Sequence, residues 1–224
     1  MTSPAPGGDP ERRLALRYAP ASARGALDAL FALDATLGAI LRSTTEPMVG
    51  QIRLTWWHEA LERLDAGMVP AEPVLSALAH DVLGRGVTGA QLAGMIDGWE
   101  ALLDTALDGH ALEAHAAARG GGLFGAAGVV LGAWGDPVAA AGQGWALADL
   151  SRRLSDQALA MAARDRARPL LRAACAARWS RAGRALGALA HLARRDLDIA
   201  PGESVPVGAP GRVARIFWHR ISGF

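Results

Sequence analysis

Aspartates and arginines at helical spacing are the residues of this sequence best suited to chemistry. Asp149 and Asp156 are seven residues apart, so a helix through this segment places both carboxylates on one face. Arg152 and Arg153 lie between them. These two arginines could hold a phosphate directly as fixed guanidinium donors, or they could pair with the two aspartates. The segment therefore suggests either an anion site or a helix surface stabilised by ion pairs.

Other candidates for metal or nucleophilic chemistry are weaker. Asp104 and Asp108 form a D-x-x-x-D pair, for which a solvated helix face is a simpler interpretation than a magnesium site. His110 and His115 are five residues apart, which is not the spacing that puts two metal ligands on one helical face. Cys175 is the only cysteine and stands in an Ala/Leu/Arg run typical of a small buried thiol. We expect no zinc site.

The composition excludes several classes of protein. The 224 residues are 51% hydrophobic and 20% charged, so the chain is neither disordered nor, with one cysteine, held together by internal disulfides. A net charge of +1 gives no support for nucleic acid as a partner. The longest uncharged stretch, residues 120–135, is interrupted by glycine and is shorter than a bilayer span. We therefore expect a cytoplasmic protein, with contact to the inner membrane surface as an open alternative.

Helix-forming residues and helix-ending signals predict an all-α chain of about eight helices. Residues 1–18 are expected to be a flexible tail and residues 19–224 a single helical domain. The expected helices span residues 22–42, 47–66, 74–83, 88–108, 110–134, 136–163, 169–195 and 212–222.

The expected helix 110–134 is unusual because it contains six glycines. Each interior glycine costs roughly 1 kcal/mol relative to alanine, so the glycines require a structural reason. Two reasons are possible: close approach of a neighbouring helix, or space for a bulky ligand beside the backbone.

Three segments, in order along the chain, resemble the squalene/phytoene synthase family. The first runs from Phe31 through Arg42 to the Ile-Arg-Leu-Thr-Trp-Trp run that begins at Ile52. The second is Ala118-Arg-Gly-Gly-Gly-Leu-Phe in the glycine-rich helix, and the third is Gly144 to Asp156. The resemblance covers nearly the whole chain from about residue 19.

This resemblance implies an isoprenoid synthase (class I trans-prenyltransferase) fold and a known chemistry. Members of the family condense isoprenyl diphosphates head to head. Aspartate-rich motifs on two facing helices hold magnesium ions, which bind the diphosphate and help it leave. Several carboxylates must converge to hold such a cluster of cations, and D-x-x-x-D on each helix supplies them.

The sequence departs from the family's aspartate motifs. Where the first motif is expected, the chain has Gly38, Ala39 and Arg42, and Asp34 one turn earlier is the nearest carboxylate. Asp156 matches the first aspartate of the second motif, but its partner four residues later is Ala160. Because most of the metal-binding carboxylates are missing, we do not expect ordinary magnesium-dependent ionisation of an isoprenyl diphosphate.

The leading hypothesis is therefore a protein that has lost catalysis, similar to the degenerate branch of the family that includes a mitochondrial complex I assembly factor. It would bind an isoprenoid-like, isoprenyl diphosphate-like or other apolar ligand, or a protein partner, and would need no cofactor. The alternative is an active transferase that uses magnesium held by Asp34, Asp149 and Asp156. No catalytic residue is assigned. The candidate ligand-binding residues are Asp34, Arg53, Trp57, Gly121, Gly122, Asp149, Arg153 and Asp156.

The last expected helix, 212–222, carries Ile216, Phe217, Trp218 and Ile221 among arginines. We expect it to dock on the helical body, with a membrane surface as the alternative, because a helix of about 12 residues is a weak interfacial anchor.

Overall fold

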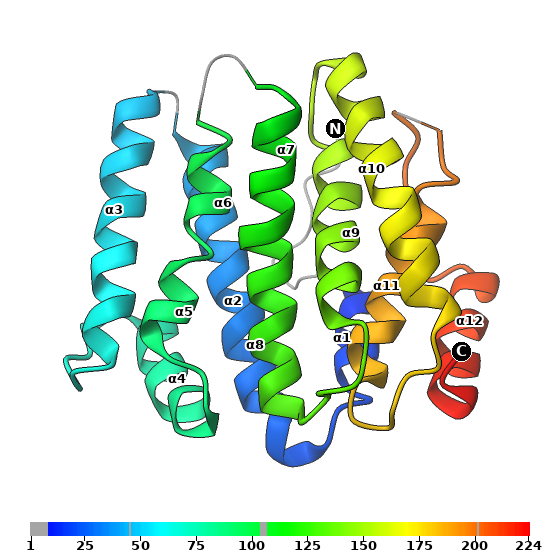
Figure 1. Ribbon diagram of the computed structural model, residues 1–224, viewed down its shortest axis with the longest axis horizontal. Helices are drawn as coiled ribbons and strands as arrows, with labels where there is room; N and C mark the ends of the chain where they lie inside the picture. Colours follow the sequence, from blue (N-terminus) through cyan, green and yellow to red (C-terminus); the bar gives the residue numbers. More distant parts are fainter. Residues whose placement is uncertain (1–8, 45, 104–106, 201) are drawn as a thin grey trace.

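The chain folds as a bundle of long helices whose axes run in a similar direction (Figure 1). The computed structural model describes residues 9–44, 46–103, 107–200 and 202–224, and across these ranges it contains no β-strand. The predicted all-α fold is confirmed. The helices are α1 (Pro10–Leu16), α2 (Ala21–Ser43), α3 (Pro47–Leu64), α4 (Pro73–Asp81), α5 (Gly89–Ala93), α6 (Asp97–Glu100), α7 (Gly109–His115), α8 (Gly122–Leu131), α9 (Val138–Ser151), α10 (Gln157–Ala176), α11 (Arg184–Asp196) and α12 (Pro210–Ser222), with a 3-10 turn η1 (Leu83–Arg85) and a π-helical turn η2 (Ala116–Gly121).

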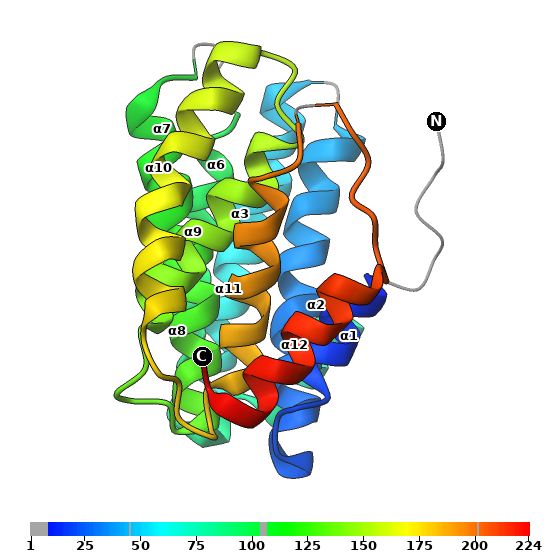
Figure 2. The same cartoon turned by 90° about the vertical axis from the view of Figure 1, so that its right-hand side faces the viewer.

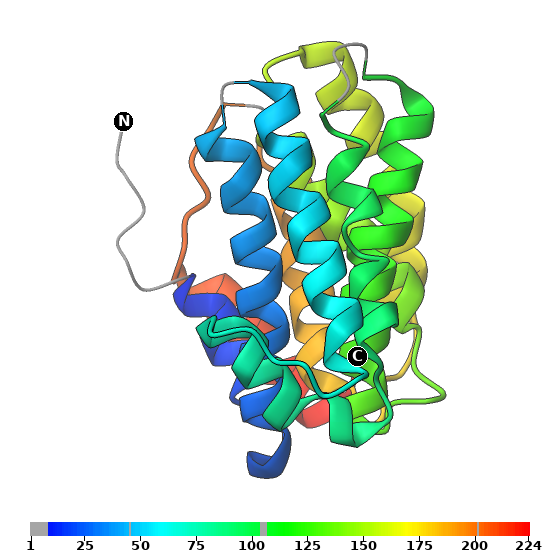
Figure 3. The same cartoon turned by 90° about the vertical axis from the view of Figure 1, so that its left-hand side faces the viewer.

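Helix α9 lies at the centre of the bundle and positions the site. It packs against η2, α8, α10 and α11 (Figure 1). Helices α2 and α3 lie side by side on the face seen in Figure 3, and α2 also packs against α8. Most of the apolar residues of α2, α8 and α9 are buried in one continuous core.

Several helix limits follow from signals in the sequence. Helix α3 has Pro47 in its first turn, where a missing N–H costs nothing. The chain leaves the end of α3 through Gly67, whose φ of 74° is in the left-handed region that glycine favours. Helix α5 begins at a capping box in which the Thr88 hydroxyl and the Gln91 side chain each accept a backbone N–H.

The expected helix 88–108 is wrong, because the chain turns after Gly94 and forms the short helices α5 and α6 instead. Glycine is a poor helix former, and the turn brings Gly98 of α6 against the backbone of η2. Of the Asp104 and Asp108 pair, Asp104 lies outside the described residues. Asp108 caps α7, where its Oδ1 accepts the Ala111 N–H at 2.9 Å.

The expected helix boundary at Pro169 is also wrong. Helix α9 ends at Ser151, and α10 begins at Gln157 and continues through Pro169 to Ala176. Asp156 sets this boundary, since its carboxylate accepts the N–H groups of Ala158 and Leu159 at 2.8 and 3.0 Å. Burial of one face of α10 offsets the roughly 3 kcal/mol that an internal proline costs.

Part of the expected tail is ordered structure. Residues 10–16 form α1, and Glu11 on this helix is buried. Its carboxylate accepts hydrogen bonds from Nε and Nη2 of Arg212 on α12, the closest at 2.7 Å. Arg212 also pairs with Asp196 at the end of α11. The prediction that residues 1–18 form a flexible tail is therefore corrected for residues 10–16, which form α1. Residues 1–8 lie outside the described part of the chain.

No helix in the described ranges combines the length and the apolar character needed to cross a bilayer.

Candidate functional site

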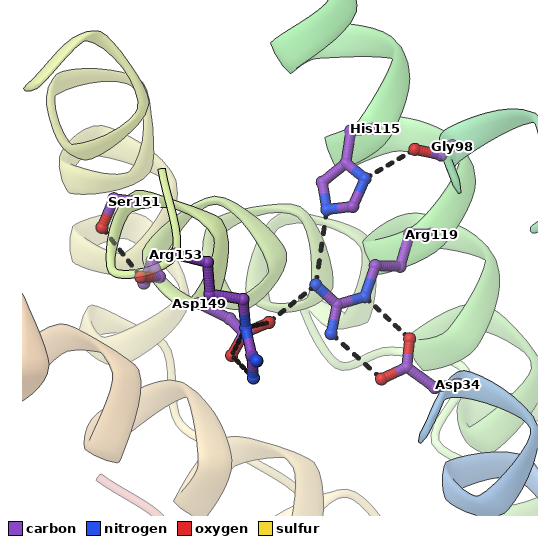
Figure 4. Close-up of polar contacts among 8 residues, drawn as sticks. Asp34, Gly98, His115, Arg119, Asp149, Ser151 and Arg153 are labelled. Atoms are coloured by element: carbon purple, nitrogen blue, oxygen red, sulfur yellow. Dashed lines mark hydrogen bonds and ion pairs between the residues drawn. The ribbon is translucent and has the colours of Figure 1, made fainter. Parts of the chain in front are cut away.

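A single buried arginine joins the two helices that carry the candidate aspartates. Arg119 projects from η2 and is 3% exposed. Its Nε and Nη2 donate to the two carboxylate oxygens of Asp34 on α2, at 2.7 and 3.0 Å. Its Nη1 donates to Oδ2 of Asp149 on α9 at 2.8 Å (Figure 4). The guanidinium group therefore lies between two carboxylates that face each other across the bundle.

Two indole rings complete the surroundings of Arg119. The guanidinium carbon lies 4.4 Å from the ring centroid of Trp99 and 4.7 Å from that of Trp145. Such cation–π contacts are worth about 2 kcal/mol when the cation is desolvated. The positive charge of Arg119 is stable in the core because the two carboxylates and the two rings surround it, although its desolvation alone would be costly.

His115 extends the cluster on the side away from the aspartates. Its Nδ1 donates to the carbonyl oxygen of Gly98 at 2.6 Å, and its Nε2 lies 3.3 Å from Nη1 of Arg119 (Figure 4). Burial and then the Arg119 charge lower the pKa of His115 to about 4. The ring is therefore neutral at pH 7, and its Nε2 accepts from Arg119.

Asp149 connects the buried cluster to the surface. It also accepts from Nη2 of Arg153 at 2.8 Å, one turn later in sequence, and the Arg153 side chain is half exposed. Burial would raise the pKa of Asp149, but the charges of Arg119 and Arg153 outweigh it and hold this pKa well below its usual range. Burial would likewise lower the pKa of Arg119, and the charges of Asp34 and Asp149 raise it instead. Asp149 and Arg119 are therefore both charged at neutral pH.

Of the eight candidate residues, Asp34, Asp149 and Arg153 come together in this cluster. Asp156 lies apart from it as the N-cap of α10. Arg53 is exposed, and its Nη1 donates to the hydroxyl oxygens of Ser43 and Thr44 at 3.1 and 3.3 Å. Trp57 is buried, with its ring edge-on to that of Trp56.

Gly121 and Gly122 do not line an open space. A Cβ on Gly122 would lie 2.8 Å from Cγ of Met95, so the Met95 side chain fills this position. A Cβ on Gly121 would be in ordinary contact with the Gln143 side chain, at 3.7 Å. Between the two reasons offered for the glycine run, these contacts favour close packing over room for a ligand.

A cavity of about 710 Å³ lies beside the cluster, on the α1 and α11 side of α9. Among its described lining residues are five arginines and three aspartates, which leaves a formal charge of +2 (5 − 3). Its apolar wall is formed by Trp145, Leu189, Leu192, Val205 and Val207. The charged residues are Asp9, Arg12, Arg13, Asp149, Arg152, Arg153, Asp196 and Arg212.

Four residues of the site were missed in the sequence: Trp99, His115, Arg119 and Trp145. A signal for one of them exists, because Arg119 is the only charged residue of the run from Ala116 to Gly122. A lone arginine among alanines and glycines indicates a buried cation, which requires an acidic partner. The two tryptophans carry no comparable signal.

The described residues do not fit a magnesium site. Both oxygens of Asp34 and both of Asp149 are occupied by guanidinium donors. No group of three or more His, Cys, Asp and Glu side chains is arranged to hold a metal ion in the part of the chain that the structure describes. Magnesium bound between diphosphate and protein needs more free carboxylate oxygens than this cluster offers.

Comparison with known proteins identifies the family. The family model of squalene/phytoene synthase matches residues 5–166, well over half of the chain. The chain belongs to the squalene/phytoene synthase family. No curated protein and no solved structure matches it in the same comparisons. The range matched to the squalene/phytoene synthase model includes Asp34, Arg119 and Asp149, whereas α11 and α12 lie beyond it.

Proposed function

We propose that this squalene/phytoene synthase-like protein is non-catalytic and has replaced the metal site of its family with a fixed cation. The observation that carries the proposal is the guanidinium of Arg119 between Asp34 and Asp149. In the family that the sequence resembles, carboxylates on two facing helices hold magnesium. Here an internal arginine supplies the positive charge between those helices, and together with Arg153 it occupies both oxygens of each carboxylate.

The cavity beside the cluster supports a ligand with an anionic head and an apolar body, such as an isoprenoid diphosphate or a related amphiphile. Arg13 is exposed and Arg152 is half-buried among the residues that line the cavity, and guanidinium groups bind phosphate through paired donors. Leu189, Leu192 and Val205 offer an apolar surface for a chain. The volume lies within the range usual for small-molecule sites.

The degenerate branch with a complex I assembly factor suggests a second use for the same cavity. In that case the protein would act on a partner protein during assembly, with or without the bound ligand. The exposed apolar surfaces outside the cavity are compatible with this use.

The proposal is tested with farnesyl diphosphate and magnesium on the full chain. We expect saturable binding in a calorimeter and no release of diphosphate. Replacing Arg13 and Arg152 together by alanine should weaken binding by at least tenfold, because two charge-assisted contacts are lost. Arg166→Ala is the matched control, since Arg166 is partly exposed and is not among the residues that line the cavity.

Two outcomes decide against the proposal. Release of diphosphate at enzyme-like rates, abolished by Asp149→Ala, would identify an active transferase. If the protein binds neither farnesyl diphosphate nor farnesol nor a fatty acid, the ligand hypothesis is rejected. Binding of a protein partner would then be the remaining function.

A further inference from the structure

The C-terminal helix α12 has an inner face that docks on the bundle and an outer face that is apolar. Arg212, Ile216 and His219 point inward and are at most 5% exposed. The outer face repeats at i, i+4, i+5 and i+8, which is one side of a helix. Its large apolar residues are Val213, Phe217, Trp218 and Ile221, between 38 and 58% exposed, and Phe224 follows at 46%.

Figure 2 shows α12 lying across the outside of the bundle, next to α1 and α11. Nothing among the described residues covers its outer face. The expectation that the helix docks on the body is thus met by its inner face alone.

The charges around the outer face of α12 are positive. Of its three arginines, Arg220 is exposed and Arg215 is partly exposed, whereas Arg212 faces inward, and the helix contains no acidic residue. Three more arginines border its ends: Arg195 lies 3.5 Å from the Cβ position of Gly211, and Arg184 and Arg178 lie 3.4 and 3.5 Å from that of Gly223. The acidic groups nearby, Glu11 and Asp196, are engaged with Arg212.

We propose that α12 binds the surface of an anionic lipid bilayer. Tryptophan and phenylalanine side chains partition into the interface of a membrane, and arginines beside them pair with lipid phosphates. The row of apolar side chains is parallel to the helix axis, so all of it can enter the interface while the inner face stays docked. The proposal does not depend on the ligand of the cavity.

Helix α3 has a second exposed apolar surface, whose charges differ from those of α12. It also exposes large apolar side chains, with Ile52 at 64% and Trp56 at 46%. Acidic residues accompany them, since Glu59 lies in the same shallow surface pocket and Glu62 follows one turn later. Arg53 and Arg63 balance these two glutamates, so this surface has no net positive charge to attract an anionic bilayer, and α3 therefore serves as the internal control.

The test is co-sedimentation of the full chain with vesicles of phosphatidylcholine, alone or mixed with phosphatidylglycerol. We expect binding to the mixed vesicles, weaker binding to phosphatidylcholine alone, and loss of binding at high salt. The double variant Phe217→Ser/Trp218→Ser should bind mixed vesicles at least about tenfold more weakly. Ile52→Ser/Trp56→Ser should bind as the unchanged protein does.

A second variant distinguishes a loss of vesicle binding from a loss of folding. Ile221→Glu places a negative charge at a position 58% exposed and leaves the inner face intact, so it should also lose binding without a change in melting temperature. Equal binding of the α12 and α3 variants would overturn the proposal. So would a failure of the unchanged protein to bind mixed vesicles, or a dimer in solution that the α12 variants dissociate, which would make the face a contact between two copies.

Discussion

The backbones of Gly120 on η2 and Gly142 on α9 touch. A Cβ on Gly120 would overlap the carbonyl oxygen of Gly142, and a Cβ on Gly142 would overlap that of Gly120. This crossing brings Arg119, next to Gly120, within reach of Asp149, two turns after Gly142. The glycine pair therefore determines the distance between the cation and one of its two carboxylates.

Alanine at either position of this pair should destabilise the fold strongly. Because the obstacle is backbone rather than a flexible side chain, we expect Gly142→Ala to lower the free energy of unfolding by roughly 3 kcal/mol or more. Chemical denaturation measures it. Gly125→Ala is the control, since a Cβ there would meet no described atom within 4 Å, and the better helix former should add up to about 1 kcal/mol. Equal effects of the two substitutions would contradict the proposed crossing.

Removal of Arg119 should leave two carboxylates without a counter-charge. We expect Arg119→Ala to cost about 3–5 kcal/mol of unfolding free energy, because one partner of a buried ion pair is lost. Arg153→Ala should cost far less, since Arg153 is half exposed and Asp149 keeps Arg119. Denaturant titrations of the two variants compare them directly.

If Arg119 takes the place of a metal ion, its removal should create a weak affinity for divalent cations. Millimolar magnesium should then raise the melting temperature of Arg119→Ala and leave that of the unchanged protein as it is. A rise of the same size in both proteins would argue against substitution of the metal by arginine.

Three buried histidines should make the fold sensitive to mild acid. Burial, together with the charges of nearby arginines, lowers the pKa values of His115, His191 and His219 to about 4, 3 and 4. Between pH 6.5 and about 4 the unfolded chain binds protons that the folded chain does not. The contribution of these histidines to the free energy of unfolding is therefore fully present above about pH 6.5. It falls with decreasing pH, by up to about 1.4 kcal/mol per pH unit for each histidine.

Urea denaturation at a series of pH values measures this slope. His191→Gln should reduce it by about one proton, whereas His80→Gln, at an exposed position, should leave it unchanged. A stability that stays constant down to pH 5 would refute the assignment. Asp149 affects the free energy of unfolding in a lower pH range than the histidines do. Its pKa is lowered in the folded protein, so its contribution is lost only as the pH falls below the pKa of about 3.9 in the unfolded chain.

The ion pair between Glu11 and Arg212 should hold both ends of the described chain on the bundle. We expect Glu11→Gln to cost about 3 kcal/mol, since Arg212 would remain buried with only Asp196 as its acidic partner. Hydrogen exchange should accelerate in α1 and α12 together. Glu62→Gln, which removes an exposed partner of His58, should change neither helix. Faster exchange in α1 alone would show that Arg212 does not link the two helices.

Local signals predict much of the fold but little of the site. Proline in a first turn and the Thr88 capping box mark helix starts because these groups act within one turn. Pro169 misleads, since its local cost is offset by burial that only the tertiary structure supplies. The resemblance to the family directs attention to Asp34 and Asp149. The residue that joins them, 85 positions from one and 30 from the other, is not defined by any local pattern.

The π-helical turn η2 makes the cluster depend on chain length. A wide turn of this kind accommodates an additional residue within a helix, and such turns are frequent at functional sites. Deletion of one residue between Ala116 and Gly121 would therefore restore an ordinary helix with α7 and α8 in nearly the same orientation, and would remove the wide turn from which Arg119 projects. A single-codon deletion is thus enough to dismantle this arrangement.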